Sequence, residues 1–86
     1  MSELSQLKAQ VNQIGEQAAT LAGQIAQMAQ NLEGNMAAVS QAIGGTSSGE
    51  DETMIASFQA ANNALNDAAT SLQAAGNAAK SWAAKV

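Results

Sequence analysis

Apolar residues recur at alternating gaps of three and four through the first half of this 86-residue chain. This spacing places their side chains on one face of an α-helix. The first stripe contains Leu4, Leu7, Val11, Ile14, Ala18, Leu21, Ile25, Met28 and Leu32, and it continues through Met36, Val39 and Ile43. Two gaps of four follow one another around Leu32, a stutter that locally unwinds a left-handed supercoil. The pattern predicts one helix over residues 3–43, roughly 60 Å long.

A second stripe with the same spacing occupies the end of the chain. It contains Met54, Phe58, Ala61, Leu65, Ala68, Leu72, Ala75, Ala79, Trp82 and Val86. Large residues alternate with alanine along much of it, and such alternation lets a partner helix approach closely. Lys80 and Lys85 lie in the last turns, where cations complement the helix dipole. We therefore expect a second helix over about residues 51–84.

The two stripes are separated by a short run of glycine and hydroxyl residues, Gly44-Gly45-Thr46-Ser47-Ser48-Gly49. This run is the strongest helix breaker in the chain. The acidic run Glu50-Asp51-Glu52 follows it, and we interpret these carboxylates as first-turn charges that complement the helix dipole. A calcium site is the alternative, but the run lacks the alternating ligands of an EF-hand loop. A break this short predicts an all-α antiparallel two-helix hairpin, a single domain of residues 1–86 with its turn at 44–50.

Small residues flank both stripes. They are Gly15, Ala22 and Ala29 in the first half and Ile55, Ala69, Gly76 and Ala83 in the second, with Ile55 as the large exception. They widen each apolar face beyond the narrow seam of a two-helix pair. A lone hairpin has no third element to cover these flanks and is marginal at this size. We therefore predict that two hairpins pair into a four-helix-bundle dimer, with the interface formed by Leu7, Ile14, Leu21, Ile25, Met28, Phe58, Leu65, Leu72 and Trp82.

Trp82 and the glycines each allow two interpretations. Trp82 either packs in the stripe against the first helix or forms a partly exposed anchor of the kind found at interaction hot spots. Its place in the stripe favours the packed position. Gly15 borders the stripe, which favours close helix packing there, whereas Gly23 and Gly34 fall on the far face.

The composition excludes several classes of function. The chain has no Cys, His, Tyr or Pro, so no thiol, imidazole or zinc chemistry is available to it. Three Lys against seven acidic residues give a net charge of −4, which argues against nucleic-acid binding. The longest apolar run has four residues, too short for a membrane span or a signal peptide. We expect a non-enzymatic protein-interaction module without metal or cofactor.

The stretch from Ile43 to Trp82 resembles the Trp-x-Gly (WxG) family of type VII secretion substrates. Small residues, Gly49 and Glu50 stand in the order of the family's turn, and Phe58-Gln59-Ala60-Ala61 follows with Leu65 and Leu72 at the family's heptad positions. The family's Trp position holds Ser47, and its C-terminal Tyr-x-x-x-Asp/Glu export motif has no counterpart in a chain without Tyr. The resemblance assigns a recognition turn to Gly45, Ser47, Gly49 and Glu50.

The resemblance implies a bacterial helical-hairpin protein that dimerises with itself or a related hairpin. Such proteins are exported folded by an ATPase-driven machine, without a signal peptide, and lie in the cytoplasm before export. In the family the turn of one chain and the C-terminal tail of its partner together form the recognition surface. The chain would act as a secreted substrate or as the partner or chaperone of one. Two alternatives stay open: a subunit or chaperone of another secretion apparatus, and a structural coiled-coil adaptor.

Overall fold

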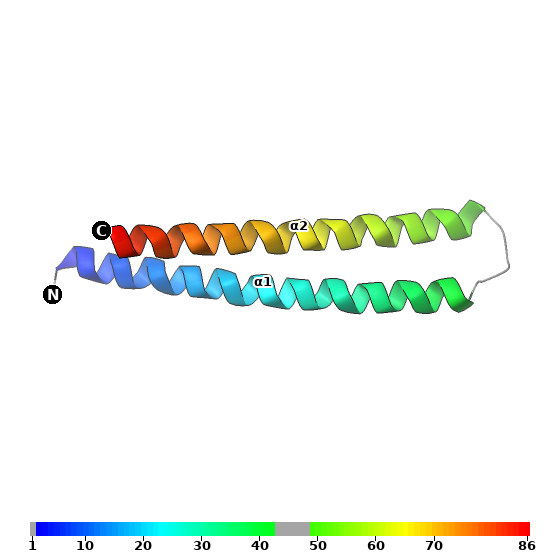
Figure 1. The fold of residues 1–86 in the computed structure, drawn as a ribbon, viewed down its shortest axis with the longest axis horizontal. Coiled ribbons are helices and arrows are strands. Elements are labelled where there is room, and N and C mark those ends of the chain that lie inside the picture. Colours follow the sequence, from blue (N-terminus) through cyan, green and yellow to red (C-terminus); the bar gives the residue numbers. More distant parts are fainter. Residues whose placement is uncertain (1, 43–48) are drawn as a thin grey trace.

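The computed structural model describes residues 2–42 and 49–86, which form two antiparallel helices (Figure 1). Helix α1 spans Glu3–Ala42 and helix α2 spans Gly49–Lys85. Together they make a rod of 67 × 16 × 14 Å with both chain ends at one end. The predicted all-α hairpin is confirmed, and the helix bounds agree with the predicted 3–43 and 51–84 within two residues. Ile43 and most of the predicted turn lie outside the described residues.

The start of α1 has a local cap. The backbone N–H of Ser5 donates to Oγ of Ser2 at 3.2 Å, so Ser2 satisfies one of the donors that a helix leaves unpaired at its N-terminus. Lys85 lies in the last turn of α2, as the sequence predicts. Among the residues that the structure describes, no helix is long and apolar enough to cross a bilayer.

Three rows of residues run along each helix and differ in burial. The inner rows contain all the residues that are buried in the described helices, namely Gly15, Ala22 and Ala29 on α1 and Asn62, Gly76 and Ala83 on α2. The other inner-row positions are half-buried, and they are Lys8 and Met36 on α1 and Ile55 and Ala69 on α2. The middle rows are half-buried, and they consist of Val11, Ala18, Ile25, Leu32 and Val39 on α1 and Phe58, Leu65, Leu72 and Ala79 on α2. The outer rows are exposed, and they consist of Leu7, Ile14, Leu21 and Met28 on α1 and Met54, Ala61, Ala68, Ala75 and Trp82 on α2.

This order of burial shows that the positions expected for the stripe and for its flanks are wrong. The residues expected on the flanks lie in the inner rows, together with Lys8 and Asn62. The stripe residues form the middle and outer rows, except for Met36, which lies in the inner row. Trp82 is accordingly 40% exposed, so its expected packing in the seam is wrong. The stutter at Leu32 also disappears from the seam, because the inner and middle rows keep gaps of three and four through Ile25, Ala29, Leu32, Met36 and Val39.

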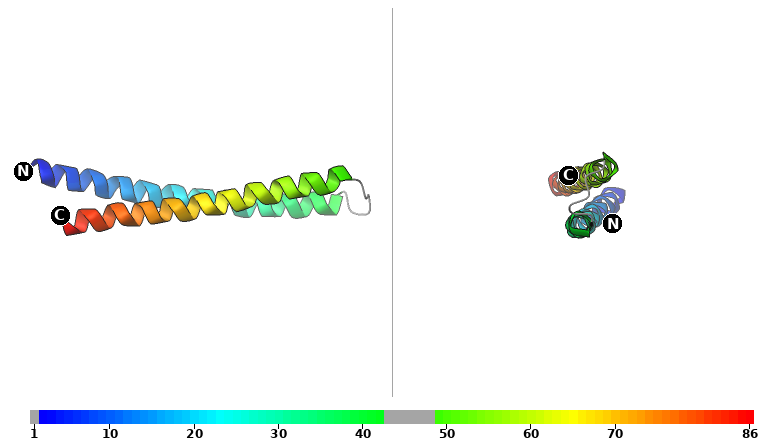
Figure 2. Two further views of the ribbon diagram at one scale, coloured as in Figure 1. Left: turned by 90° about the horizontal axis from the view of Figure 1, so that it is seen from above. Right: turned by 90° about the vertical axis from the view of Figure 1, so that its right-hand side faces the viewer.

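Gly15 and Gly76 mark a point of very close approach between the helices. A Cβ atom built on Gly15 would lie 2.9 Å from the carbonyl oxygen of Gly76, and one built on Gly76 would lie 2.8 Å from that of Gly15. The predicted close packing at Gly15 is therefore confirmed. The helices cross at a shallow angle when seen from above, which fits packing along their whole length (Figure 2).

The hydrophobic core of the described hairpin contains only alanines, Ala22, Ala29 and Ala83. Among the described residues no large side chain is fully buried. A buried methyl group contributes about 0.8 kcal/mol and a fully buried Leu or Ile about 1.5–3 kcal/mol. The seam of the hairpin therefore uses only a small part of the hydrophobic free energy that the chain's large side chains could supply.

Candidate interaction surface

The outer row of α1 is a line of large apolar side chains in contact with solvent. Their exposed fractions lie between 46 and 59% and belong to Leu7, Ile14, Leu21 and Met28. These residues are seven apart, so they stay on one side of α1. On α2 the ends of the outer row are also large, with Met54 37% and Trp82 40% exposed, and alanines fill the positions between them.

Both outer rows lie on the same side of the hairpin. In an antiparallel pair, equivalent positions of the two helices flank the seam on the same side. Each outer row borders the middle row of its own helix, so the four rows form one continuous apolar surface. We call the middle and outer rows of both helices together the apolar face. It extends along most of the rod.

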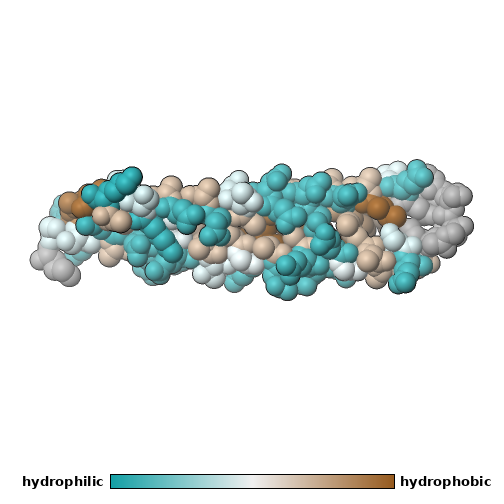
Figure 3. Space-filling model, viewed as in Figure 1, coloured by the Kyte–Doolittle hydropathy of each residue, from teal (hydrophilic) through white to brown (hydrophobic). Residues whose placement is uncertain are grey.

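The apolar face carries no ionisable side chain between its two ends. The positions that border the outer rows are uncharged too, with Gln10, Gln17, Gln24 and Asn31 along α1 and Ser57, Ala64, Ser71 and Ala78 along α2. In Figure 3, by contrast, hydrophilic residues cover much of the visible surface, and strongly hydrophobic colour shows in small areas, mostly toward the ends. An uncharged rim around an apolar centre can be covered by another protein without burying a charge.

The structure brings the predicted interface residues onto this one surface. Ile25, Phe58, Leu65 and Leu72 lie in its middle rows, and Leu7, Ile14, Leu21, Met28 and Trp82 lie in its outer rows. The predicted turn residues are not placed in the same way. Gly45 and Ser47 lie outside the described residues, and Gly49 and Glu50 begin α2.

Asn62 is a polar residue that the sequence reasoning missed. It lies in the inner row of α2, is 7% exposed, and its Oδ1 has no hydrogen-bond partner. A buried unpaired polar atom costs about 1–3 kcal/mol. Asn62 sits one position after the stripe residue Ala61, at the same offset as Gly76 after Ala75, so the heptad spacing of the small residues could have placed it in the seam.

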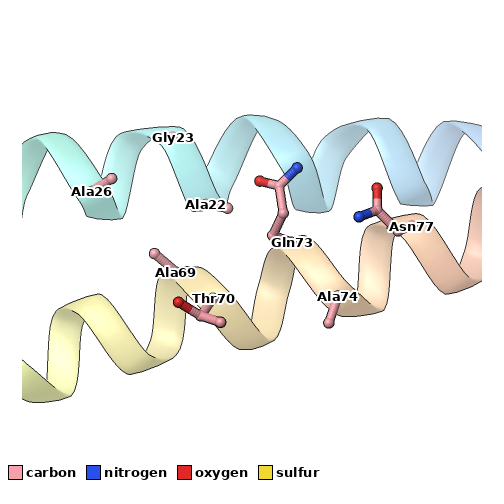
Figure 4. Close-up of a pocket in the computed structure, with 8 residues that line it drawn as sticks. All are labelled: Ala22, Gly23, Ala26, Ala69, Thr70, Gln73, Ala74 and Asn77. Carbon is pink, nitrogen blue, oxygen red and sulfur yellow. The ribbon is translucent and has the colours of Figure 1, made fainter.

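A shallow groove of about 490 Å³ lies on the other side of the inner rows, away from the apolar face (Figure 4). Its lining residues are Ala22, Gly23, Ala26, Ala69, Thr70, Gln73, Ala74 and Asn77. Gln73 and Asn77 point from α2 toward α1 in Figure 4. The lining contains no ionisable side chain, so the groove offers no group for acid–base catalysis.

The described residues also provide little that could bind a metal ion or act as a nucleophile. No group of three or more His, Cys, Asp or Glu side chains occurs among them. Several hydroxyl groups donate to a backbone carbonyl four residues earlier in the same helix, as Thr20 does to Glu16 at 3.1 Å and Thr70 does to Asn66 at 3.0 Å. These bonds are the local satisfaction usual for Ser and Thr within a helix.

The apolar face is thus the feature of the described hairpin that most directly indicates a function, because large exposed apolar patches often mark interaction sites. Comparisons with protein-family models, with curated proteins and with solved structures found no match to this chain.

Proposed function

We propose that this chain is a non-enzymatic helical-hairpin protein of the type VII secretion class, which pairs through its apolar face with another helical hairpin. It acts as a secreted substrate or as the partner of one. The observation that supports the pairing is that small residues are buried between the two helices while large apolar residues are exposed to solvent. Most of the buried residues of the seam are alanines and glycines, while Ile14 and Met28 are 59% and 53% exposed.

The energetics support a helical partner. Large apolar side chains contribute most of their free energy only when they are covered. The hairpin leaves those of the outer rows exposed and those of the middle rows half-buried. The spacing of the outer rows, seven residues within each helix, matches the spacing by which helices pack on one another. A second helical hairpin presents such rows in the same geometry, and its pairing with this face would complete a four-helix bundle.

The export role rests on the resemblance of the turn region to the WxG family. The hairpin architecture agrees with that resemblance, and Gly49 stands where α2 begins. A structural adaptor would need the same helices but no export. Secretion therefore discriminates between the proposal and this alternative.

Export is tested in a bacterium with an active type VII system and in an otherwise identical strain that lacks the secretion ATPase. We expect the chain in the culture filtrate of the first strain and only in the cells of the second. Equal amounts in both filtrates, or none in either, would contradict the export role. Gln27 lies outside the apolar face on α1, so Gln27→Ser is a matched control for Leu21→Ser, which we expect to lower export by weakening pairing.

A further inference from the structure

We infer that Met28 is an oxidation site, and that its conversion to methionine sulfoxide by a peroxide blocks pairing through the apolar face. This regulation rests on the proposed function, which assigns the face to a helical partner. The evidence is the placement of the methionine sulfurs in the hairpin and the chemistry of the side chains around them.

The thioether sulfur is the group of this chain that a peroxide oxidises. The chain contains four Met and one Trp but no Cys, His or Tyr. Exposed cysteine thiolates are common targets of oxidants in proteins, and no such group competes here. Oxidation of Met to its sulfoxide turns an apolar side chain into a polar one, and in some proteins it serves as a regulatory switch.

The methionines among the described residues differ in their exposure to solvent. Met28 is 53% exposed in the outer row of α1, and Met54 is 37% exposed at one end of the outer row of α2. Met36 lies half-buried in the inner row of α1. Because a peroxide must reach the sulfur to react, we expect Met28 to be oxidised first and Met36 last.

The reaction balances with the peroxide as the only co-reactant. A lone pair of the Met28 sulfur attacks one oxygen of hydrogen peroxide, so that an S–O bond forms and the O–O bond breaks. The sulfur loses two electrons, and the leaving hydroxide takes the proton of the transferred oxygen to become water. Methionine sulfoxide reductases reverse the change. Two thiols then supply the two electrons as they form a disulfide, and the oxygen leaves as water.

The sulfoxide changes the chemistry of the apolar face at one point. Ile25 and Leu32 lie three residues before and four residues after Met28, so they are its neighbours on this face. A thioether packs against such aliphatic side chains and adapts to the surface of a partner. A sulfoxide adds a polar oxygen, which has no hydrogen-bond donor when a partner covers it with apolar groups. We therefore expect oxidation of Met28 to weaken pairing by about tenfold or more.

Pairing and oxidation of Met28 exclude each other. A partner on the apolar face covers the Met28 sulfur, so a peroxide reaches it only in the unpaired hairpin. The sulfoxide then keeps that hairpin unpaired until a reductase restores the thioether. Met36 lies in the seam between α1 and α2 and outside the apolar face, so pairing leaves its exposure unchanged.

The site is tested first by treatment of the full chain with hydrogen peroxide, followed by peptide mass spectrometry of each methionine. We expect Met28 to be oxidised several-fold faster than Met36. The rate at Met28 should fall as the protein concentration rises, because pairing covers its sulfur, whereas the rate at Met36 should stay constant. Equal rates at the two sites, or a rate at Met28 that is independent of concentration, would overturn the inference.

The effect on pairing is tested by sedimentation equilibrium before and after oxidation, with Met28→Leu and Met36→Leu as matched variants. Leucine conserves the volume and apolar character of methionine but has no sulfur to oxidise. We expect oxidation to raise the dissociation constants of the wild-type chain and of Met36→Leu by about tenfold or more. The constant of Met28→Leu should change by less than about threefold. Treatment with methionine sulfoxide reductases should restore the wild-type constant.

The outcomes separate failure of this switch from failure of the proposed pairing. A wild-type chain that associates equally well after complete oxidation, or a Met28→Leu variant that is weakened as much as wild type, would overturn the role of Met28 and leave pairing intact. An unoxidised chain that stays at 8.6 kDa would contradict pairing with a copy of itself, and the switch with it. Circular dichroism should show unchanged helicity after oxidation, because Met28 is exposed in the hairpin. Loss of helicity would overturn the switch in favour of unfolding. The export experiment tests the proposed function independently of these results.

Discussion

Gly15 and Gly76 face each other across the hairpin so closely that a Cβ atom on either would lie within 2.9 Å of the other's backbone oxygen. The two helices therefore pack backbone to backbone at this level. Glycine is destabilising within a helix by about 1 kcal/mol relative to alanine. At these two positions the close packing of the helices compensates for the low helix propensity of glycine. It also leaves the larger side chains on the outside of the molecule.

Substitution at either glycine should loosen the hairpin. In Gly15→Ala the new methyl group would lie 2.9 Å from the backbone oxygen of Gly76 and 3.0 Å from Cγ of Lys80. A backbone oxygen within a helix cannot move aside cheaply, so we expect a net loss of about 1–3 kcal/mol despite the better helix propensity of alanine. Thermal unfolding followed by circular dichroism at matched protein concentration measures this loss.

Gly23 and Gly34 provide matched controls because a Cβ atom on either would have no neighbour within 4 Å. Gly23→Ala and Gly34→Ala should each stabilise the chain by about 0.8–1 kcal/mol through helix propensity alone. If all four glycine substitutions changed the unfolding midpoint in the same direction, the close packing of Gly15 and Gly76 would not be the reason for their presence.

Removal of the buried amide of Asn62 should stabilise the hairpin. Its Oδ1 has no partner, so Asn62→Ala abolishes a desolvation cost of about 1–3 kcal/mol and also improves helix propensity. Chemical denaturation measures the gain. Asn63→Ala is the control, since Asn63 is exposed and its replacement changes only propensity, by no more than about 0.7 kcal/mol. Equal gains from the two variants would show that the amide of Asn62 finds a partner in solution.

The helices and their hairpin arrangement follow from the sequence because the evidence for them is local. Gaps of three and four recur over both halves, and the glycine-rich run from Gly44 to Gly49 separates them. Neither observation depends on how the helices touch each other. The cap at Ser2 is local as well, but Ser2 lies before the apolar stripe, so the spacing of the stripe does not predict it.

The identity of the seam could not be deduced from the apolar stripe in the same way. Neighbouring rows on a helix differ by about 40–60° in direction, so periodicity alone does not say which row faces the other helix. Residue size favours the middle and outer rows, which contain Ile25 and Leu21, as the seam. Close backbone packing instead selects the row that contains Gly15 and Ala22. The apparent stutter arose because the large residues change rows: Met28 belongs to the outer row, and Met36 belongs to the inner row.

Trp82 should report pairing through its fluorescence. It is the only Trp of a chain without Tyr, and it is 40% exposed in the hairpin, at the end of the outer row of α2. Coverage of the apolar face removes water from the indole ring. We therefore expect its emission to shift to shorter wavelengths, and quenching by acrylamide to decrease, as protein concentration rises. An emission spectrum independent of concentration while the mass doubles would place Trp82 outside the interface.

Replacement of an outer-row residue should weaken pairing without unfolding the helices. Ile14 is 59% exposed in the hairpin, so Ile14→Ser removes little packing within one chain. In a symmetric dimer the loss occurs twice, and we expect the dissociation constant to rise by about tenfold or more. Gln13→Ser, at the adjacent exposed position off the apolar face, is the control and should leave the constant unchanged. Equal effects of the two variants would show that the apolar face is not the interface.

Sedimentation equilibrium of the unmodified chain over a wide concentration range tests most directly whether a second copy covers the apolar face. The account predicts a mass that rises from 8.6 kDa toward twice that value as concentration increases. A mass that stays at 8.6 kDa at every concentration would contradict it.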